Sequence, residues 1–124
     1  MTIATRHGMD IRERALEFSV ALLRFCRQLD LQDVALRTVS RQLVRSGTSI
    51  GANLEEAQSG ESRSDFIHKN AIALKEARET RYWLRLLLAS GFAPNSTRRE
   101  LQQECEEIMK VLGAIIVAAK GGAE

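Results

Sequence analysis

The sequence predicts an all-α protein, in which residues 1–124 form one antiparallel, up-and-down four-helix bundle. Composition is the first reason: Leu, Ala, Arg and Glu dominate, there is one Pro, and aromatic residues make up 5% of the chain. This balance favours helices over sheets. The second reason is that apolar residues recur at helical spacing in four segments separated by short polar breaks. The length suits a single domain, and amphipathic helices with short loops pack most simply as an antiparallel bundle.

The first helix is predicted over residues 10–29. Asp10 is its N-cap, because a carboxylate at that position accepts hydrogen bonds from the free N–H groups of the first turn. One apolar stripe follows the helical period. It consists of Ile11, Ala15, Phe18, Leu22, Phe25, Cys26 and Leu29. We expect a break at about residues 30–36.

The second helix is predicted over residues 36–59, with Gly60 as its C-terminal stop. Its apolar stripe consists of Val39, Leu43, Ser46, Ile50, Leu54 and Ala57. Gly47 and Gly51 lie inside this helix, where each costs about 1 kcal/mol relative to Ala. Two glycines four residues apart indicate that another backbone approaches closely; the alternative is that they only weaken the helix.

The third helix is predicted over residues 63–90, between a capping-box-like start at Ser62 and Asp65 and a stop at Gly91. One apolar face carries Phe66, Asn70, Ala73, Ala77, Leu84 and Leu88. A second face, rotated by roughly 100°, carries Ile72, Trp83 and Leu87. Two apolar faces exceed what one four-helix core buries. We interpret the second face as an oligomer interface, with a broad core as the alternative.

The fourth helix is predicted over residues 98–120. Thr97 with Glu100 forms a capping box, Pro94 lies just before it, and the glycine pair at 121–122 ends the helix. Its stripe consists of Leu101, Cys105, Ile108, Leu112, Ile115 and Ala119.

The sequence carries no sign of a targeting or membrane segment. Residues 1–10 lack the apolar run of a signal peptide, and the longest apolar stretch, 111–119, is too short to span a bilayer. We therefore expect a soluble, cytoplasmic protein with no membrane partner.

Catalytic and metal chemistry are not expected. Cys26 and Cys105 fall on apolar stripes, which is typical of buried thiols, and neither histidine is placed to activate them. A di-iron bundle needs Glu-x-x-His motifs, but neither His7 nor His68 follows a Glu by three residues. No phosphate-binding glycine loop is present. The sequence therefore predicts no enzyme, no catalytic residue, no metal and no cofactor.

Several polar residues border the apolar faces and are expected to be structural. Asn53 and Glu56 lie beside the stripe of the second helix, and Glu76 and Arg81 interrupt the faces of the third. An unpaired buried charge lowers the stability of a protein by several kcal/mol. We therefore expect the charged residues among them to form interhelical or intersubunit pairs.

Arginine supplies 14 of the 18 basic residues, although the net charge is only +2. Arg37, Arg41 and Arg45 recur at every fourth position, and no acidic residue occurs between Val34 and Leu54. On the third helix, a shared face carries Arg78 and Arg85, with Lys75 and Tyr82 beside it. Such a row is typical of a phosphate-facing surface. A solvated face and a row of intersubunit ion pairs are the alternatives.

Residues 49–57, with the sequence Ser-Ile-Gly-Ala-Asn-Leu-Glu-Glu-Ala, resemble the signature of the four-helix-bundle family also called the 23S rRNA intervening-sequence protein family. Gln42 and Ser46 fit the lead-in of that signature. Matching positions in the third helix are Asp65, Phe66, Ile67, Ile72, Ala73, Leu74, Glu76, Glu79, Trp83 and Leu84. The resemblance extends over about residues 10–120. The chain lacks the Pro-containing lead-in that relatives often carry before the second helix.

The resemblance implies a small antiparallel bundle that assembles as a homo-oligomer, with a ring-like pentamer favoured. Some relatives are encoded inside intervening sequences of bacterial rRNA genes. Distantly similar bundles serve as nucleic-acid-binding accessory proteins of reverse transcriptases. No enzymatic activity is established for the family.

Two functions remain open from the sequence. The first is a non-enzymatic oligomeric bundle that binds RNA or DNA phosphates through its basic helix faces, without reading sequence. The second is a protein-interaction scaffold that docks a partner protein such as a reverse transcriptase. Steep salt dependence of binding would separate the first from the second.

Overall fold

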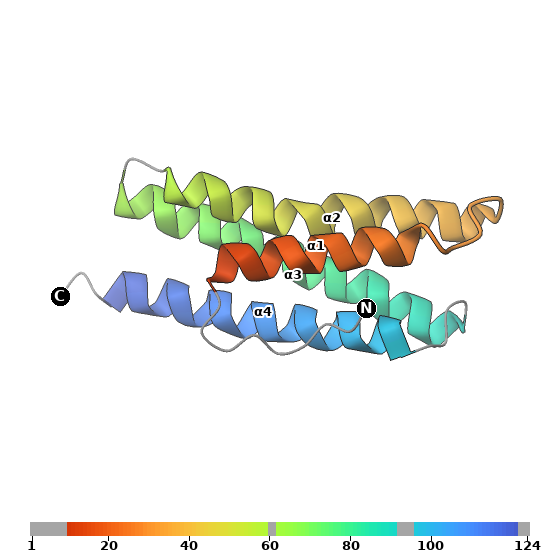
Figure 1. Cartoon of the computed structure of the whole chain (residues 1–124). Coiled ribbons are helices and arrows are strands. Elements are labelled where there is room, and N and C mark those ends of the chain that lie inside the picture. Colours follow the sequence, from red (N-terminus) through yellow and green to blue (C-terminus); the bar gives the residue numbers. More distant parts are fainter. Residues whose placement is uncertain (1–9, 60–61, 92–95, 122–124) are drawn as a thin grey trace.

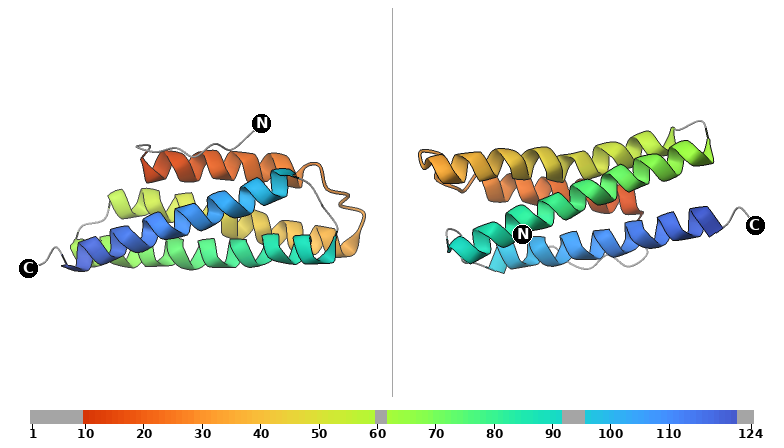
Figure 2. Two further views of the ribbon diagram at one scale, coloured as in Figure 1. Left: turned by 90° about the horizontal axis from the view of Figure 1, so that it is seen from below. Right: turned by 180° about the vertical axis from the view of Figure 1, so that it is seen from behind.

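The computed structural model describes residues 10–59, 62–91 and 96–121. This part of the chain forms the helices α1 (Ile11–Cys26), α2 (Val34–Gln58), α3 (Arg63–Ser90) and α4 (Ser96–Gly121). Consecutive helices run in opposite directions (Figure 1), and α2 packs against α1 and α3 while α4 packs against α1 and α3. Figure 2 shows α4 running obliquely across α3. The predicted all-α four-helix bundle is therefore confirmed.

Side-chain caps fix where three of the helices begin. The Asp10 carboxylate accepts from the Arg12 N–H at 2.7 Å, and the Ser62 hydroxyl accepts from the Asp65 N–H at 3.0 Å, as predicted. The start of α2 differs from the prediction. Asp33 accepts from the Leu36 N–H at 3.1 Å, so α2 begins at Val34 rather than at residue 36.

Two other predicted boundaries also need correction. Helix α1 ends at Cys26 instead of residue 29, so the break before α2 comes earlier than expected. Helix α4 already includes Ser96, so Thr97 lies inside the first turn and is not the N-cap. The expected stop at Gly60, the proline at position 94, Gly122 and His7 lie outside the described residues.

The core follows the predicted stripes of α1, α2 and α4. Its fully enclosed side chains include Phe18, Leu22, Leu43, Ile50, Leu54, Leu101, Ile108 and Leu112. Ile11, Leu29, Val39 and Ile115 are half-buried at its margins. Both cysteines are buried, as their stripe positions predict.

The apolar faces of α3 are divided differently from the prediction. Leu87 is 1% exposed and belongs to the core, whereas Leu88, assigned to the core face, is 37% exposed. Ile72 and Trp83 are half-buried at the edge of the core. The second apolar face is therefore narrower than expected, because Leu87 turns inward next to Leu84. A residue that its own bundle buries cannot contact another subunit, so the prediction that Leu87 belongs to an oligomer interface is wrong.

The two glycines of α2 lie against α1. A Cβ built on Gly47 would stand 2.1 Å from Cδ2 of Leu22, and one on Gly51 would stand 3.5 Å from the Cβ of Ala15. The Ser19 hydroxyl also reaches the Gly47 carbonyl at 3.5 Å. The prediction that another backbone approaches both glycines is therefore only partly correct. At Gly47 the space is filled by the Leu22 side chain of α1, and only Gly51 has a backbone atom of α1, in Ala15, within 4 Å.

Buried polar groups tie the helices together inside the core. Arg14 of α1 donates two hydrogen bonds to Glu104 of α4, from Nε at 2.7 Å and from Nη2 at 2.9 Å. Between α2 and α3, the Thr80 hydroxyl lies 2.9 Å from the Ser46 hydroxyl, which itself donates to the Gln42 carbonyl at 2.8 Å. Arg98 at the start of α4 is also fully buried, and burial lowers the pKa of its guanidinium.

Candidate nucleic-acid interface

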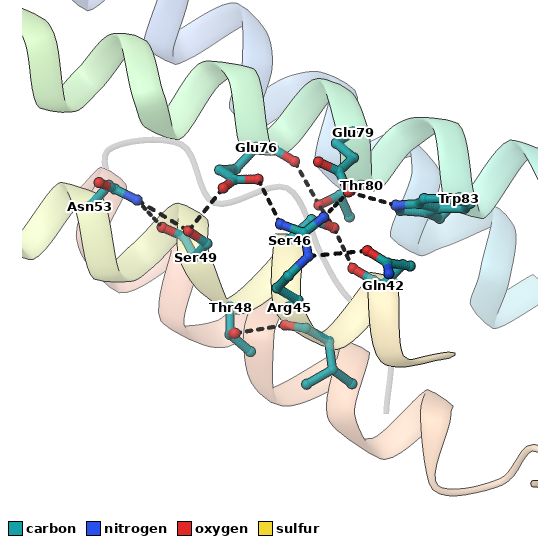
Figure 3. Close-up of polar contacts among 11 residues, drawn as sticks. Gln42, Arg45, Ser46, Thr48, Ser49, Asn53, Glu76, Glu79, Thr80 and Trp83 are labelled. Atoms are coloured by element: carbon teal, nitrogen blue, oxygen red, sulfur yellow. Dashed lines mark hydrogen bonds and ion pairs between the residues drawn. The ribbon is translucent and has the colours of Figure 1, made fainter. Parts of the chain in front are cut away.

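A polar seam joins α2 and α3 on the surface of the bundle. Figure 3 shows Arg45 reaching from α2 to two carboxylates of α3, Glu76 at 3.5 Å and Glu79. Arg45 also donates to the Gln42 side chain at 3.1 Å. Glu79 accepts in addition from the indole N–H of Trp83 at 3.0 Å. The charge of Arg45 is therefore neutralised within the chain.

The same seam continues along α2 toward its C-terminal end. The amide of Asn53 donates to the Ser49 carbonyl at 2.9 Å and lies 3.1 Å from the Ser49 hydroxyl, which donates to Glu76 at 3.3 Å. Glu76 thus forms an interhelical ion pair with Arg45, and Asn53 is hydrogen-bonded within α2. Glu56 is exposed and pairs with no described residue, so its predicted interhelical pair is absent from the described chain.

Arg81 does not form the interhelical ion pair that was predicted for it within the described chain. It is half-buried on α3 and lies close enough to Cys105 to act electrostatically on the thiol. It forms no ion pair with a carboxylate of the described chain.

The side chains of Arg37 and Arg41 are exposed on the surface of α2. Neither forms an ion pair with any described residue. The Arg37 guanidinium reaches only the Leu31 carbonyl, at 3.5 Å. Together with Leu31, Ser40, Val44 and Arg45, these two arginines line a groove of about 430 Å³. Of the three arginines in the predicted row, Arg37 and Arg41 therefore have no carboxylate partner in the described chain, whereas Arg45 is paired with Glu76 and Glu79. We call Arg37 and Arg41 the open arginine pair.

Arg78 and Arg85 lie on a separate surface. Both are exposed on α3, and Arg85 lines a second groove of about 510 Å³ with Tyr82 and Leu86 of α3 and Gln102 of α4. The first groove is formed by α2 and the connection before it, and the second by α3 and α4. The five predicted arginines consequently do not make one continuous belt within a single chain.

Neither cysteine is placed for chemistry. Burial raises the pKa of the Cys105 thiol to about 12, and the thiol donates to the Ala77 carbonyl at 3.2 Å. Burial also raises the pKa of Cys26. His68 is exposed on α3. Across residues 10–59, 62–91 and 96–121, no group of three or more His, Cys, Asp or Glu side chains could hold a metal ion.

The sequence alone could not identify the partners of two arginines. Arg14 binds a carboxylate 90 positions away, and Arg45 binds carboxylates 31 and 34 positions away. The absence of acidic residues around Arg45 on α2 indicated a free row, but α3 supplies the acids. The only available signal was the position of Glu76 and Glu79 on the face of the third helix that carries Trp83.

None of the helices in the described residues combines the length and the apolar character needed to cross a membrane.

Comparison with known proteins places the chain among small helical bundles. The family described as 23S rRNA-intervening sequence protein matches residues 7–114. A crystal structure from Bacteroides thetaiotaomicron, described as a protein with unknown function from the S23 ribosomal protein family, has a TM-score of 0.80 and 40% sequence identity. The similarity covers 86% of this chain and 98% of that chain. None of the curated proteins compared with the chain matches it.

Proposed function

Since the chain belongs to the 23S rRNA-intervening sequence protein family, we propose that it is a non-enzymatic, cytoplasmic bundle that binds nucleic acid through backbone phosphates. The observation that carries the proposal is the open arginine pair Arg37 and Arg41. These side chains are one helical turn apart, exposed, and without a carboxylate partner in the described chain. Arginine forms bidentate, charge-assisted hydrogen bonds with phosphate, so such a pair suits two phosphates of one strand.

The contrast with Arg45 supports this function. Where α3 offers carboxylates, the arginine of the row is paired with them. Arg37 and Arg41, which have no such carboxylate, line a groove together with the apolar residues Leu31 and Val44. An unbalanced cationic groove attracts polyanions, and the attraction weakens with added salt.

RNA is the first ligand to test. The description of the family names an intervening sequence of 23S rRNA, and the structural relative is described as belonging to a ribosomal protein family. Phosphate contacts alone do not distinguish RNA from DNA, so the proposal covers both.

The test compares Arg41→Glu with Arg63→Glu. Both substitutions reverse one exposed arginine, but Arg63 begins α3, at the end of the bundle away from the start of α2 (Figure 1). Binding of mixed-sequence RNA and DNA is measured by fluorescence anisotropy across a salt series. We expect Arg41→Glu to weaken binding to unrelated sequences alike and to reduce the salt slope by about 1, as for the loss of one phosphate contact. Arg63→Glu should bind like the wild type.

Wild-type protein without salt-sensitive binding to either nucleic acid would contradict the proposal. So would equal losses in the two variants, because the effect would then reflect net charge and not the groove. If Arg41→Glu instead separates the subunits of an oligomer while remaining helical, the arginine row joins subunits, and the protein is a scaffold.

We further propose that the protein is a homo-oligomer, with a pentamer favoured by the family resemblance. Support comes from Ile72 and Trp83, two apolar side chains of α3 that are only half-buried in the bundle. In a symmetric assembly every basic groove would be repeated, so contacts that are weak in one subunit would act together.

A further inference from the structure

We infer that Tyr82, between Arg78 and Arg85 on α3, is a stacking platform for an unpaired base, so that the protein prefers single-stranded nucleic acid to duplex. This inference rests on the proposed function and adds to it the form of nucleic acid that is bound. It concerns the second groove, which is separate from the one formed by Arg37 and Arg41.

The exposure of Tyr82 is the first observation. Tyr82 is 56% exposed, so much of its large apolar ring remains open to a ligand. It lines the groove of about 510 Å³ between α3 and α4 with Arg85, Leu86 and Gln102.

The ring of Tyr82 is also held in place. It lies edge-to-face with Trp83, with ring centroids 5.1 Å apart and an interplanar angle of 72°. Trp83 is in turn fixed by its hydrogen bond to Glu79, which is paired with Arg45. A ring oriented in advance loses little conformational freedom when a base stacks on it.

Cations flank the ring along the helix. Arg78 precedes Tyr82 by four residues and Arg85 follows it by three, which places them about 6 Å before and about 4.5 Å after it along the axis. Lys75 adds a third exposed cation one turn before Arg78. A carboxylate also lies near the groove, because Gln102 donates to Glu106 at 3.4 Å. The exposed cations outnumber it on this surface.

An aromatic ring between cations suits single-stranded nucleic acid. A base stacks on the ring while neighbouring phosphates meet the arginines. Bases in a duplex are already stacked on each other and cannot reach such a platform. An acidic protein segment would satisfy the arginines, but it would gain less from an exposed tyrosine face than a base does.

The experiment uses the full chain and three ligands of equal length: a mixed-sequence single-stranded RNA, its duplex, and an abasic single strand that keeps the phosphates but lacks the bases. The variants are Tyr82→Ala and Tyr82→Phe, of which the second keeps the stacking face. Trp83 is the only Trp of the chain, and its ring contacts Tyr82, so its fluorescence is expected to respond to a base that stacks on Tyr82.

We expect the wild type to bind the single-stranded RNA roughly 5- to 100-fold more tightly than the abasic strand, with a change in Trp83 fluorescence. Tyr82→Ala should abolish this difference, Tyr82→Phe should retain it, and duplex binding should be the same in all three proteins.

Two results would overturn the inference in different ways. If Tyr82→Ala binds every ligand as the wild type does, the platform is refuted, while phosphate binding through Arg37 and Arg41 stands. If no ligand binds the wild type, the proposed function fails and this inference fails with it. A loss of oligomeric mass in Tyr82→Ala would assign the groove to contact between copies and would also overturn the inference.

Discussion

The space next to Gly47 sets how closely α1 and α2 approach. Leu22 fills the position that a side chain at residue 47 would take, and Leu22 is itself fully enclosed by the core. Gly51, one turn later, has ordinary contact distances to Ala15. The two glycines are therefore not equivalent, although their spacing in the sequence suggested the same role for both.

Gly47→Leu is expected to destabilise the protein by about 1–3 kcal/mol, because the added side chain must displace Leu22 from a filled core. The matched control is Gly113→Leu in α4, where a Cβ would meet nothing within 4 Å. Replacing glycine inside a helix is favourable when space allows, so the control should be neutral or slightly stabilising. Urea unfolding followed by circular dichroism measures both. Equal stability of Gly47→Leu and the wild type would refute the close packing.

At the scale of helices, the Arg14–Glu104 pair joins α1 to α4. The two side chains are 8% and 6% exposed, and the hydrogen bonds to Glu104 raise the pKa of Arg14. Removing both charges from water is costly, and the two-fold hydrogen bonding offsets that cost only while both partners are present. The intact pair therefore adds little net stability, but the loss of one partner is strongly destabilising.

Glu104→Gln should lower the free energy of unfolding by about 3–5 kcal/mol, because it leaves the Arg14 charge buried without its partner. The double variant Arg14→Met/Glu104→Leu should recover most of that loss. Glu55→Gln is the control, since Glu55 forms only a surface pair with Arg12 at 3.8 Å, and it should leave the unfolding midpoint unchanged. A single variant as stable as the control would mean that the pair is solvated in solution.

At the scale of the whole molecule, four helices of alternating direction enclose one core, and part of α3 keeps apolar side chains outside it. The half-buried Ile72 and Trp83 form the surface on which the proposed homo-oligomer depends. Small apolar patches are ordinary on monomers, so only a direct measurement of mass decides their role.

Light scattering of the purified chain should give a mass of several subunits, five being favoured, in place of the 13.9 kDa of a monomer. Ile72→Glu should lower that mass while the protein stays helical, because a charge at an apolar contact remains without a partner. Leu16→Glu on the exposed face of α1 should have no such effect. A wild-type monomer across the micromolar range would contradict the proposed assembly.

Much of this architecture could be predicted from the sequence because helical periodicity and capping are local. The stripes of α1, α2 and α4 and the caps at Asp10 and Ser62 were predicted, since each depends on neighbours within a few residues. The inward position of Leu87 was not predicted. Over a helix of 28 residues a small error in rotation per residue accumulates, and Leu87 and Leu88 are then exchanged.

The candidate site was less predictable because it depends on contacts between distant segments. The arginine positions of α2 and α3 could be found from the sequence, but which of them stay open depends on carboxylates brought from another helix. Arg45 and Arg41 look alike in the sequence, and only their distance from Glu76 and Glu79 separates them. The exposure of Tyr82 likewise depends on the path of α4 across α3.

The buried contacts of Ser46 and Gly47 have a consequence for the axial alignment of the bundle. These consecutive residues lie at the middle of α2, where Ser46 meets Thr80 of α3 and Gly47 accommodates Leu22 of α1. A longitudinal slip of α2 by one turn, about 5.4 Å, would break the hydroxyl pair and the glycine contact together. Two consecutive residues of α2 therefore fix the axial positions of α1 and α3 relative to α2. The two arginine-lined grooves are consequently held at fixed positions along the axis of the bundle.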